Sequence, residues 1–228
     1  GLVGKGVTMD TGGYNIKKAG MEKMKMDMSG SASVVGCMQA LAEQNSQANV
    51  VAVVSLVENR VTGNSYLPSD IIDSLSGQTI EIGNTDAEGR LVMADAMTYL
   101  QRQYAPHTVV DIATLTGAAV QAFGHDKAPV FTNNLDLSSE FEAAASGCGE
   151  AIVNVDIEQK HRDSMRGQFA DLTNSGNLGE DGHITAAAFL EYFVEGETKW
   201  AHIDIAGTAI PPGGVASGYG VKLLTQWI

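Results

Sequence analysis

The stretch Val50-Val-Ala-Val-Val-Ser-Leu-Val57 decides the fold class of this 228-residue chain. It is a continuous and largely β-branched apolar run, which predicts a strand that is covered on both faces. Three further runs of this kind lie at residues 107–115, 151–157 and 199–206. Segments with helical periodicity separate them, and this alternation is typical of an α/β fold. We therefore expect one domain over residues 1–228, with a largely parallel or mixed sheet flanked by helices.

Amphipathic spacing predicts helices between these strands. One helix is expected near residues 31–43 and another near residues 90–103. In both, apolar side chains recur at helical intervals, so each helix would bury one face against the sheet. The face of the first helix consists of Val34, Val35, Met38, Leu41 and Ala42.

A third helix is predicted from its end signals. Ser139 and Glu142 have the spacing of a capping box, which indicates the start of a helix. Gly147 and Gly149 would end that helix, because glycine is the preferred residue after a last helical turn. A fourth helix is expected near residues 185–194. The chain has no internal repeat or linker-like tract, which supports the prediction of one domain.

The composition excludes several classes of protein. The chain has 27 Asp and Glu against 14 Lys and Arg, a net charge of −13. A nucleic-acid binder driven by overall charge needs the opposite balance. No apolar run approaches the about 20 residues of a membrane-spanning helix. Cys37 and Cys148 form neither a disulfide framework nor a zinc motif. We therefore expect a cytoplasmic protein with no membrane or nucleic-acid partner.

A glycine-rich turn follows the first predicted strand, in the stretch Gly4-Lys-Gly-Val-Thr-Met-Asp-Thr-Gly-Gly13. The residue order excludes a P-loop, because Lys5 precedes the loop instead of ending it. In open α/β sheets, ligands bind beyond the carboxyl ends of the strands, which is where Asp10 lies. The alternative is a tight turn whose charged residues face solvent.

A second charged motif, Asn84-Thr-Asp-Ala-Glu-Gly-Arg90, precedes a predicted helix. In an extended segment, residues i and i+2 lie on the same side, so Asp86, Glu88 and Arg90 would project together. Adjacent carboxylates repel each other unless a proton or a cation bridges them. The alternative is an acidic first turn that interacts with the helix dipole, which leaves Arg90 unexplained.

A third acidic position, Asp27, lies between methionines just before the helix predicted near residues 31–43. Its alternative role is that of an ordinary aspartate at a helix N-terminus. The sequence thus has four carboxylates at loop positions after strands or before helices: Asp10, Asp27, Asp86 and Glu88. Lys5, Lys17 and Arg90 are nearby in sequence. Carboxylate-rich sites of this kind suit a pair of divalent ions, which polarise a carbonyl group and generate hydroxide from water.

Other catalytic motifs are missing from the sequence. The five histidines do not have metalloprotease spacing, and there is no G-x-S-x-G nucleophile motif. A two-metal phosphohydrolase is an alternative, because carboxylate pairs also serve phosphate esters, but no phosphate-cradling loop accompanies it. A catalytically silent scaffold or regulatory protein with the same fold is a further alternative. The intact set of seven charged residues argues against it.

These motifs resemble the leucyl aminopeptidase family, the dinuclear-metal cytosol aminopeptidases. The signature is the stretch from Asn84 to Leu91, and several further segments resemble the family in the same order along the chain. They are residues 3–13, 27–30, 113–117, 202–207 and 218–224. Many relatives carry a smaller residue at the position of Tyr14. In this respect the segment from Thr11 to Lys17 resembles the bacterial peptidase B branch. The family also has an N-terminal domain and earlier strands, so we expect this chain to be a catalytic-domain fragment.

The resemblance implies a metal-dependent aminopeptidase that hydrolyses the N-terminal bond of peptides with a free amino terminus, with leucine-like residues favoured. It implies two divalent ions, manganese or zinc, with magnesium or cobalt as further options. Their ligands would be Lys5, Asp10, Asp27, Asp86 and Glu88. Asp10 and Glu88 would bridge the ions, Lys5 and Asp27 would complete one site, and Asp86 the other.

Lys5 has two opposite interpretations. Only a neutral amine can bind a metal, so a ligand lysine has to lose its proton, which two nearby dications would favour. The alternative is a surface lysine whose charged end reaches solvent and stays protonated.

The resemblance also implies the remaining roles. Lys17 would stay protonated and stabilise the developing oxyanion, and Arg90 would hold a bicarbonate ion that transfers protons. Leu115 would bind the substrate through its backbone carbonyl. The first side-chain pocket would be lined by Met24, Thr114, Gly117 and Ala206. Family members assemble as hexamers, so a homo-hexamer is expected for the full-length protein.

Overall fold

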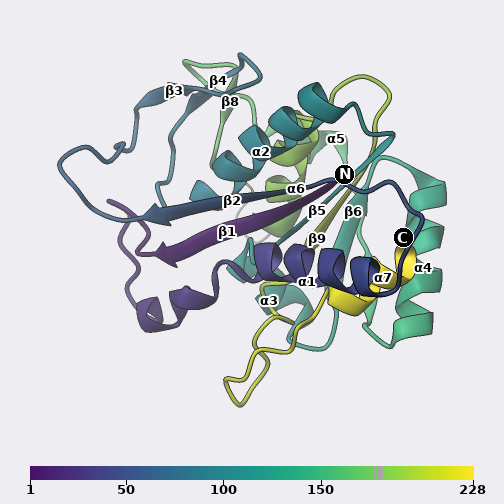
Figure 1. Ribbon diagram of the computed structural model, residues 1–228. Coiled ribbons are helices and arrows are strands. Elements are labelled where there is room, and N and C mark those ends of the chain that lie inside the picture. Colours follow the sequence, from purple (N-terminus) through teal and green to yellow (C-terminus); the bar gives the residue numbers. More distant parts are fainter. Residues whose placement is uncertain (177, 179–181) are drawn as a thin grey trace.

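The computed structural model describes residues 1–176, 178 and 182–228. Its centre is a mixed six-stranded sheet in the order β2-β1-β5-β9-β6-β7 (Figure 1). The strands β2, β1, β5 and β9 are parallel to one another, whereas β6 is antiparallel to β9 and parallel to β7. These strands are β1 (Leu2–Asp10), β2 (Ala52–Asn59), β5 (Thr108–Ala113), β6 (Ala128–Thr132), β7 (Ile152–Asn154) and β9 (Lys199–Asp204). The predicted α/β class is confirmed.

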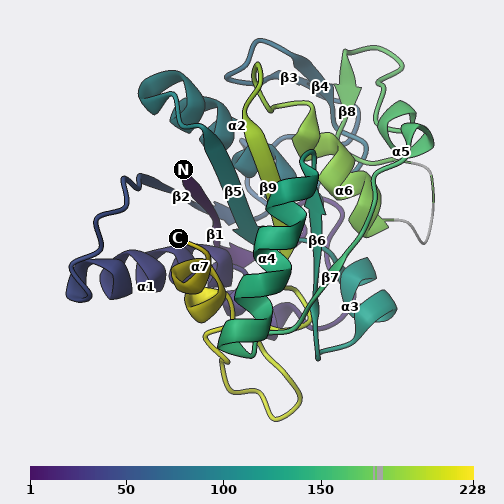
Figure 2. The ribbon, with the colours of Figure 1, turned by 90° about the vertical axis from the view of Figure 1, so that its right-hand side faces the viewer.

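Helices cover both faces of this sheet, as Figures 1 and 2 show. On one face lie α1 (Ser29–Glu43), α4 (Leu135–Cys148) and α7 (Val221–Trp227). On the other face lie α2 (Glu88–Tyr104) and α6 (Gly182–Glu191), with α3 (Gly117–Phe123) and α5 (Gln159–Asp163) against α6. A 3-10 helix, η1 (Met21–Met26), connects β1 to α1. None of the helices in the described ranges has the length and apolar character that a membrane-spanning segment needs.

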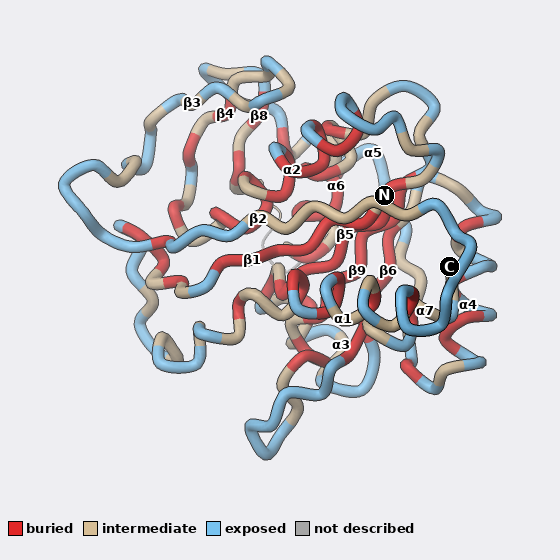
Figure 3. Tube along the Cα trace, viewed as in Figure 1, coloured by how far each residue is buried: buried red, intermediate tan, exposed pale blue. Residues whose placement is uncertain are grey.

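Each face of the sheet has its own hydrophobic core, because strand side chains alternate between the two faces. In β5, Val109 and Ala113 belong to the core beneath α2 and α6, whereas Val110 and Ile112 belong to the core beneath α1, α4 and α7. The buried positions accordingly run along the central strands in Figure 3. A small second sheet adds to the α2 core. It consists of β3 (Ile71–Asp73), β4 (Thr79–Glu81) and β8 (Leu172–Thr173).

The strand predicted at residues 50–57 forms as β2, but it is the edge strand of the described sheet. Its first half packs on both cores: Val53 on the α2 side and Val54 on the α1 side. Its second half is open, and Leu56 is 63% exposed. The prediction of full cover on both faces is therefore wrong for the end of this strand. A β-branched run indicates an extended backbone but not how many elements pack against it.

The helix predicted near residues 31–43 is confirmed as α1, but two residues of its predicted face, Val35 and Ala42, are exposed and Met38 is only partly buried. Val35 is 58% exposed, whereas Val34, Cys37 and Leu41 are buried. The buried apolar residues follow an i, i+3, i+7 stripe, and Val35 and Ala42 lie outside it because each is one position further along the helix. The sequence pattern therefore overestimated the width of this face.

The helix predicted from Ser139 begins earlier than expected. The N-terminal cap of α4 is Asn134, whose side chain accepts a hydrogen bond from the Leu137 amide at 3.0 Å. A real cap thus lies upstream of the capping-box pattern, and Ser139 lies within the helix. Gly149 ends the helix with a left-handed φ of 76°, as predicted, whereas Gly147 is helical. The helix predicted at residues 185–194 also begins earlier, at Gly182.

Candidate metal centre

The end of β1 and the turn after it bring two charged residues together. Asp10 is the last residue of β1 and is buried, and its Oδ1 accepts a hydrogen bond from the Gly12 amide at 2.8 Å. Gly12 has a φ of +87°, and a Cβ at this position would lie 2.5 Å from the Asn15 carbonyl oxygen. The turn therefore requires glycine. It folds the chain back so that Lys17 Nζ lies 2.6 Å from Asp10 Oδ2, and Asp10 does not face solvent.

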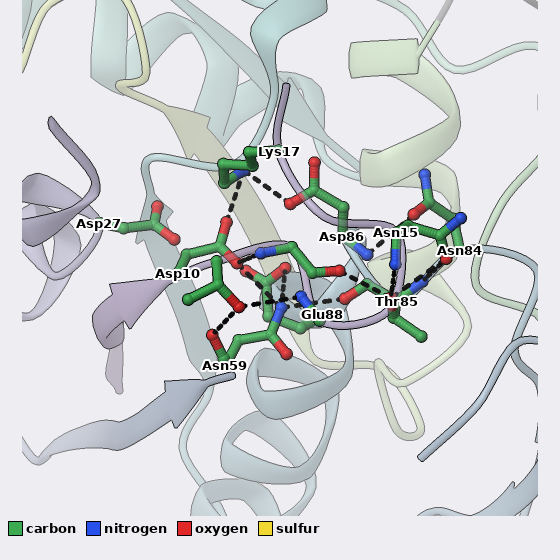
Figure 4. Close-up of polar contacts among 12 residues, drawn as sticks. Asp10, Asn15, Lys17, Asp27, Asn59, Asn84, Thr85, Asp86 and Glu88 are labelled. Carbon is green, nitrogen blue, oxygen red and sulfur yellow. Dashed lines mark hydrogen bonds and ion pairs between the residues drawn. The ribbon is translucent and has the colours of Figure 1, made fainter. Parts of the chain in front are cut away.

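Thr85 connects this turn to the second charged motif (Figure 4). Its Oγ1 donates a hydrogen bond to the Gly12 carbonyl at 2.6 Å and accepts one from the Asn15 amide at 2.8 Å. The Thr85 amide donates to Asn15 Oδ1 at 2.8 Å. Two segments that are about 70 residues apart in sequence are thereby fixed against each other, and the residues after Thr85 face the end of β1.

The carboxylates of Asp10, Asp86 and Glu88 form a compact cluster. Each offers one oxygen such that all three oxygens lie within 4.8 Å of one another. Lys17 Nζ also contacts Asp86 Oδ1 at 2.6 Å, so it bridges Asp10 and Asp86. Burial lowers the pKa of Lys17, but hydrogen bonds to Asp10 and Asp86 outweigh burial and raise it. Lys17 is therefore a cation at neutral pH.

The expectation of an extended Asp86–Arg90 segment is wrong. Glu88 begins α2 and Arg90 lies in its first turn, so the two side chains do not project together. The Arg90 guanidinium instead points to the Asn174 carbonyl, with an Nη1–O distance of 2.9 Å. An acidic residue in a first helical turn is favoured by the helix dipole, which explains why the helix begins at Glu88. The alternative interpretation, an acidic first turn of a helix, is therefore the correct one for Glu88.

Arg90 is buried but not fully hydrogen-bonded. Its Nε has no partner among the residues that the structure describes. Burial lowers the pKa of Arg90 to about 10, while the charges of Glu88 and Asp204 oppose this shift. Arg90 therefore remains a cation at neutral pH, with one donor free for another group.

Lys5 and Asp27 extend the cluster on the side of α1. Lys5 Nζ lies 2.7 Å from Asp27 Oδ1, 3.2 Å from Glu88 Oε1 and 2.9 Å from the Thr114 carbonyl oxygen. Lys5 is only 3% exposed, so the interpretation as a surface lysine is wrong. Burial by itself lowers the pKa of Lys5, but the charges of Glu88 and Asp27 outweigh it and the pKa is raised.

The acidic residues of this cluster fit divalent cations. Burial raises the pKa of Asp27 to about 6, although the positive charge of Lys5 lowers it. Burial likewise raises the pKa of Asp86 to about 6, although its hydrogen bond with Lys17 lowers it. Asp27 Oδ2 is buried without a hydrogen-bond partner in the described part of the chain. Carboxylate oxygens are hard ligands for ions such as Mg²⁺ and Mn²⁺, and Zn²⁺ also accepts them. The residues present therefore fit a metal centre.

Asn59, which the sequence analysis missed, orients two of these carboxylates. It is the buried last residue of β2. Its Nδ2 donates to Asp10 Oδ1 at 2.8 Å, to the Thr85 carbonyl at 3.0 Å and to Glu88 Oε2 at 3.3 Å. Its position at the carboxyl end of a predicted strand is the signal that could have identified it.

Asn174 was also missed, and it supports the second motif from the other side. Its side chain is fully buried. Its Oδ1 accepts from the Gly83 amide at 2.8 Å and the Asn84 amide at 3.2 Å, and its Nδ2 donates to the carbonyls of Asn84 at 2.7 Å and Ala87 at 3.3 Å. Because this asparagine is 84 residues beyond Arg90, no local pattern indicates it.

The predicted substrate residues lie on segments around this cluster. Thr114 contacts it directly, because its Oγ1 donates to Asp27 Oδ1 at 2.8 Å. The amides of Leu115 and Ala206 both donate to Asp204 Oδ1, at 3.1 Å and 3.0 Å. Gly117 begins α3, and Met24 lies in η1. The Met24 carbonyl accepts a hydrogen bond from the amide of Asp27 at 3.3 Å, so its backbone adjoins the cluster.

A cavity of about 280 Å³ lies on another side of the cluster. It shares Asn59 and Glu88 with the cluster and is otherwise lined by β2, α2, the small sheet and residues next to them such as Tyr66. None of the five predicted substrate residues lines it. We therefore do not identify it with the predicted side-chain pocket.

The sequence profile described as "Cytosol aminopeptidase family, catalytic domain" matches residues 1–225. This chain belongs to that family. It is 49% identical to the "Probable cytosol aminopeptidase" of Rhodopseudomonas palustris in an alignment that covers 100% of this chain and 46% of the relative. The protein of the same name from Chlorobium luteolum is 44% identical, over 99% of this chain and 45% of its own length.

A third relative, "Probable cytosol aminopeptidase 1" of Shewanella oneidensis, is 43% identical over 100% of this chain and 47% of its own length. The chain thus spans about half the length of the curated relatives it matches. The family is metal-dependent, in agreement with the acidic cluster at the end of β1. The resemblance noted from the sequence motifs is confirmed, and it argues against the phosphohydrolase alternative.

Proposed function

We propose that this chain is the catalytic part of a metal-dependent aminopeptidase, which hydrolyses the first peptide bond of peptides with a free amino terminus. The observation that carries this proposal is the convergence of the acidic residues from three separate segments on Lys5 and Lys17. Membership of the cytosol aminopeptidase family supports the reaction class.

Two divalent ions would be held by the buried and partly buried side chains of this cluster. Lys5 and Asp27 would complete one site and Asp86 the other, with Asp10 and Glu88 shared between them. Manganese or zinc are the proposed ions, and magnesium or cobalt are further candidates. When bound, such ions would polarise the scissile carbonyl and activate the attacking water. Asn59 would hold the two shared carboxylates in place, because it already donates to both.

Lys17 would stabilise the negative charge that develops on the carbonyl oxygen. Its raised pKa keeps it cationic, which this role requires. Its hydrogen bonds to Asp10 and Asp86 hold the ammonium group at the edge of the cluster. Its side chain is 17% exposed, so the edge it occupies can be approached from solvent.

Arg90 would bind a small anion, for which we propose bicarbonate. Its buried cationic guanidinium and its free Nε support this role. The Asn174 carbonyl fixes one Nη, which leaves the rest of the guanidinium available. A bicarbonate ion there would accept and return a proton.

The substrate would bind across the segments that follow β5 and β9. Its first side chain would contact Met24, Thr114, Gly117 and Ala206, and the Leu115 carbonyl would accept a hydrogen bond from it. These residues are mostly apolar, which favours a leucine-like side chain. We further propose that the full-length protein is a cytoplasmic homo-hexamer, and sedimentation of that protein would measure the subunit number.

The test is hydrolysis of leucine 4-nitroanilide by the full-length protein, loaded with manganese or zinc. Glu88→Ala and Lys17→Ala are each expected to lower the rate by at least about 10²-fold, because they remove a shared ligand and the oxyanion cation. Glu58→Ala is the matched control, since Glu58 is a half-exposed carboxylate next to Asn59 that pairs only with Arg60 among the described residues. Equal rates for Glu88→Ala and Glu58→Ala would contradict the proposal. Hydrolysis of 4-nitrophenyl phosphate instead of the anilide would favour the phosphohydrolase alternative.

A further inference from the structure

Asp204 joins two loops at the carboxyl edge of the sheet. It is the buried last residue of β9, beside β5. Its Oδ1 accepts from the Leu115 amide at 3.1 Å and from the Ala206 amide at 3.0 Å. Its Oδ2 accepts from Thr116 Oγ1 at 2.7 Å. One carboxylate thus binds the loop after β5 and the loop after β9 at the same time.

The loop after β5 also contacts the metal-binding cluster. Thr114 Oγ1 donates to Asp27 at 2.8 Å, and the Thr114 carbonyl accepts from Lys5 at 2.9 Å. The next two residues, Leu115 and Thr116, bind Asp204. This loop is therefore fixed by the cluster at one residue and by Asp204 at the next two. A group bound at the cluster would lie against it.

Thr116 connects Asp204 to the start of α3. While its hydroxyl donates to Asp204, its oxygen accepts the Ala119 amide at 3.0 Å and so caps the helix that begins at Gly117. A carboxylate suits this arrangement, because it accepts several hydrogen bonds and competes with no donor of its own. An asparagine would present an NH₂ group to the Thr116 hydroxyl, which would lose its acceptor.

We propose that Asp204 is a positioning residue for substrate specificity: it sets the separation of the two loops that form the first side-chain pocket. This inference rests on the proposed function and deepens it. Among the residues that the structure describes, Asp204 forms its hydrogen bonds with Leu115, Thr116 and Ala206 and none with the five proposed metal ligands, so its effect is expected on substrate binding and not on metal binding. The pocket would lose its fixed width, and thereby its preference for a larger side chain, when this link is loosened.

The experiment compares Asp204→Asn with the wild-type full-length protein, both loaded with manganese. We expect KM for leucine 4-nitroanilide to rise about tenfold, and the ratio of kcat/KM between leucine and alanine substrates to fall about tenfold, within the range that pocket contacts supply. Affinity for leucine hydroxamate, measured by calorimetry, should fall by a similar factor. Manganese content should not change.

Two further variants separate positioning from general loss of stability. Thr116→Val removes one of the three hydrogen bonds of Asp204 together with the cap on the Ala119 amide, and should lower the leucine-to-alanine ratio, whereas Thr116→Ser keeps both bonds and should retain the ratio. Glu150→Gln is the matched control, because Glu150 is a buried carboxylate that accepts the amides of Gly220 and Leu223, at the start of α7, and has no hydrogen bond with Leu115, Thr116 or Ala206. It should leave the ratio unchanged.

The outcomes distinguish this inference from the proposed function. If the wild-type protein hydrolyses the anilide but the Thr116→Val and Asp204→Asn variants keep its substrate ratio and hydroxamate affinity, the role of Asp204 is refuted. If Asp204→Asn does not fold, the inference is tested by the Thr116 variants alone, and equal leucine-to-alanine ratios for Thr116→Val and Thr116→Ser would refute it. A metal-loaded wild-type protein without peptidase activity would refute the proposed function, and this inference with it.

Discussion

Replacing Lys5 by methionine should destabilise the metal-free protein strongly. Lys5 is almost fully buried, and its Nζ is 2.7 Å from Asp27 and 3.2 Å from Glu88, which are themselves buried. Methionine fills most of the same volume but leaves both carboxylates without their cation. Removing one partner of a buried ion pair costs about 3–5 kcal/mol. Solvent screening does not reduce this value much, because neither partner is accessible.

The assay is urea unfolding of the full-length protein in the presence of a chelator. A loss of this size corresponds to a fall in the unfolding midpoint of about 1.5–2.5 M, for a denaturant slope of about 2 kcal/mol/M. Lys25→Met is the matched control, since Lys25 is an exposed lysine in η1 and should change the free energy of unfolding by less than about 0.5 kcal/mol.

A double-mutant cycle tests the cause. Asp27→Asn removes one of the two buried negative charges, so the Lys5→Met/Asp27→Asn protein should be more stable than the sum of the single effects predicts, by about 1–3 kcal/mol. The reasoning is refuted if Lys5→Met and Lys25→Met are equally stable, or if the two effects in the cycle simply add.

Three further predictions concern residues that the sequence analysis did not assign. Asn59→Leu should weaken manganese binding about 10–100-fold by calorimetry, because the two shared carboxylates lose their common donor; unchanged affinity would contradict the role of Asn59. Asn174→Asp should lower the free energy of unfolding by about 1–3 kcal/mol, because two partly buried carbonyls lose their donors, and urea unfolding measures this loss. Burial lowers the pKa of His202, but Asp111 outweighs burial and raises it, so the proton on His202 stabilises the fold fully below about pH 6.5 and less as the pH rises through its folded pKa. The free energy of unfolding should therefore fall as the pH rises above about 6.5, and Asp111→Asn should abolish that slope; an equal slope in both proteins would refute this assignment.

The sequence predicted the strands and helices well where the pattern is local. The apolar runs at β5 and β9 and the glycine turn after Asp10 are set by residues a few positions apart, and each formed as expected. Errors occurred where two local signals compete. The capping-box spacing predicted a helix start at Ser139, but the helix begins after Asn134, whose side chain accepts a hydrogen bond from the Leu137 amide in the first turn.

The candidate site was predicted in its residue types but not in its geometry. Because residues i and i+2 of an extended segment lie on the same side, we expected Asp86 and Arg90 to project together. The structure begins α2 at Glu88 instead, and turns Arg90 toward Asn174. The residues that hold the carboxylates in place, Asn59 and Asn174, come from distant segments and have no charge or motif that marks them.

The sequence by itself determined the α/β class, the family and the acidic residues that gather at the end of β1, because periodicity, glycine turns and motif order are local properties of the chain. The tertiary structure was needed to show that Lys5 is buried between Asp27 and Glu88 and that Asp204 links the loops after β5 and β9. These facts depend on which strands are neighbours, and strand order is set by packing across more than 80 residues of sequence. Burial and pairing follow from that packing, which the charge of a residue alone does not specify.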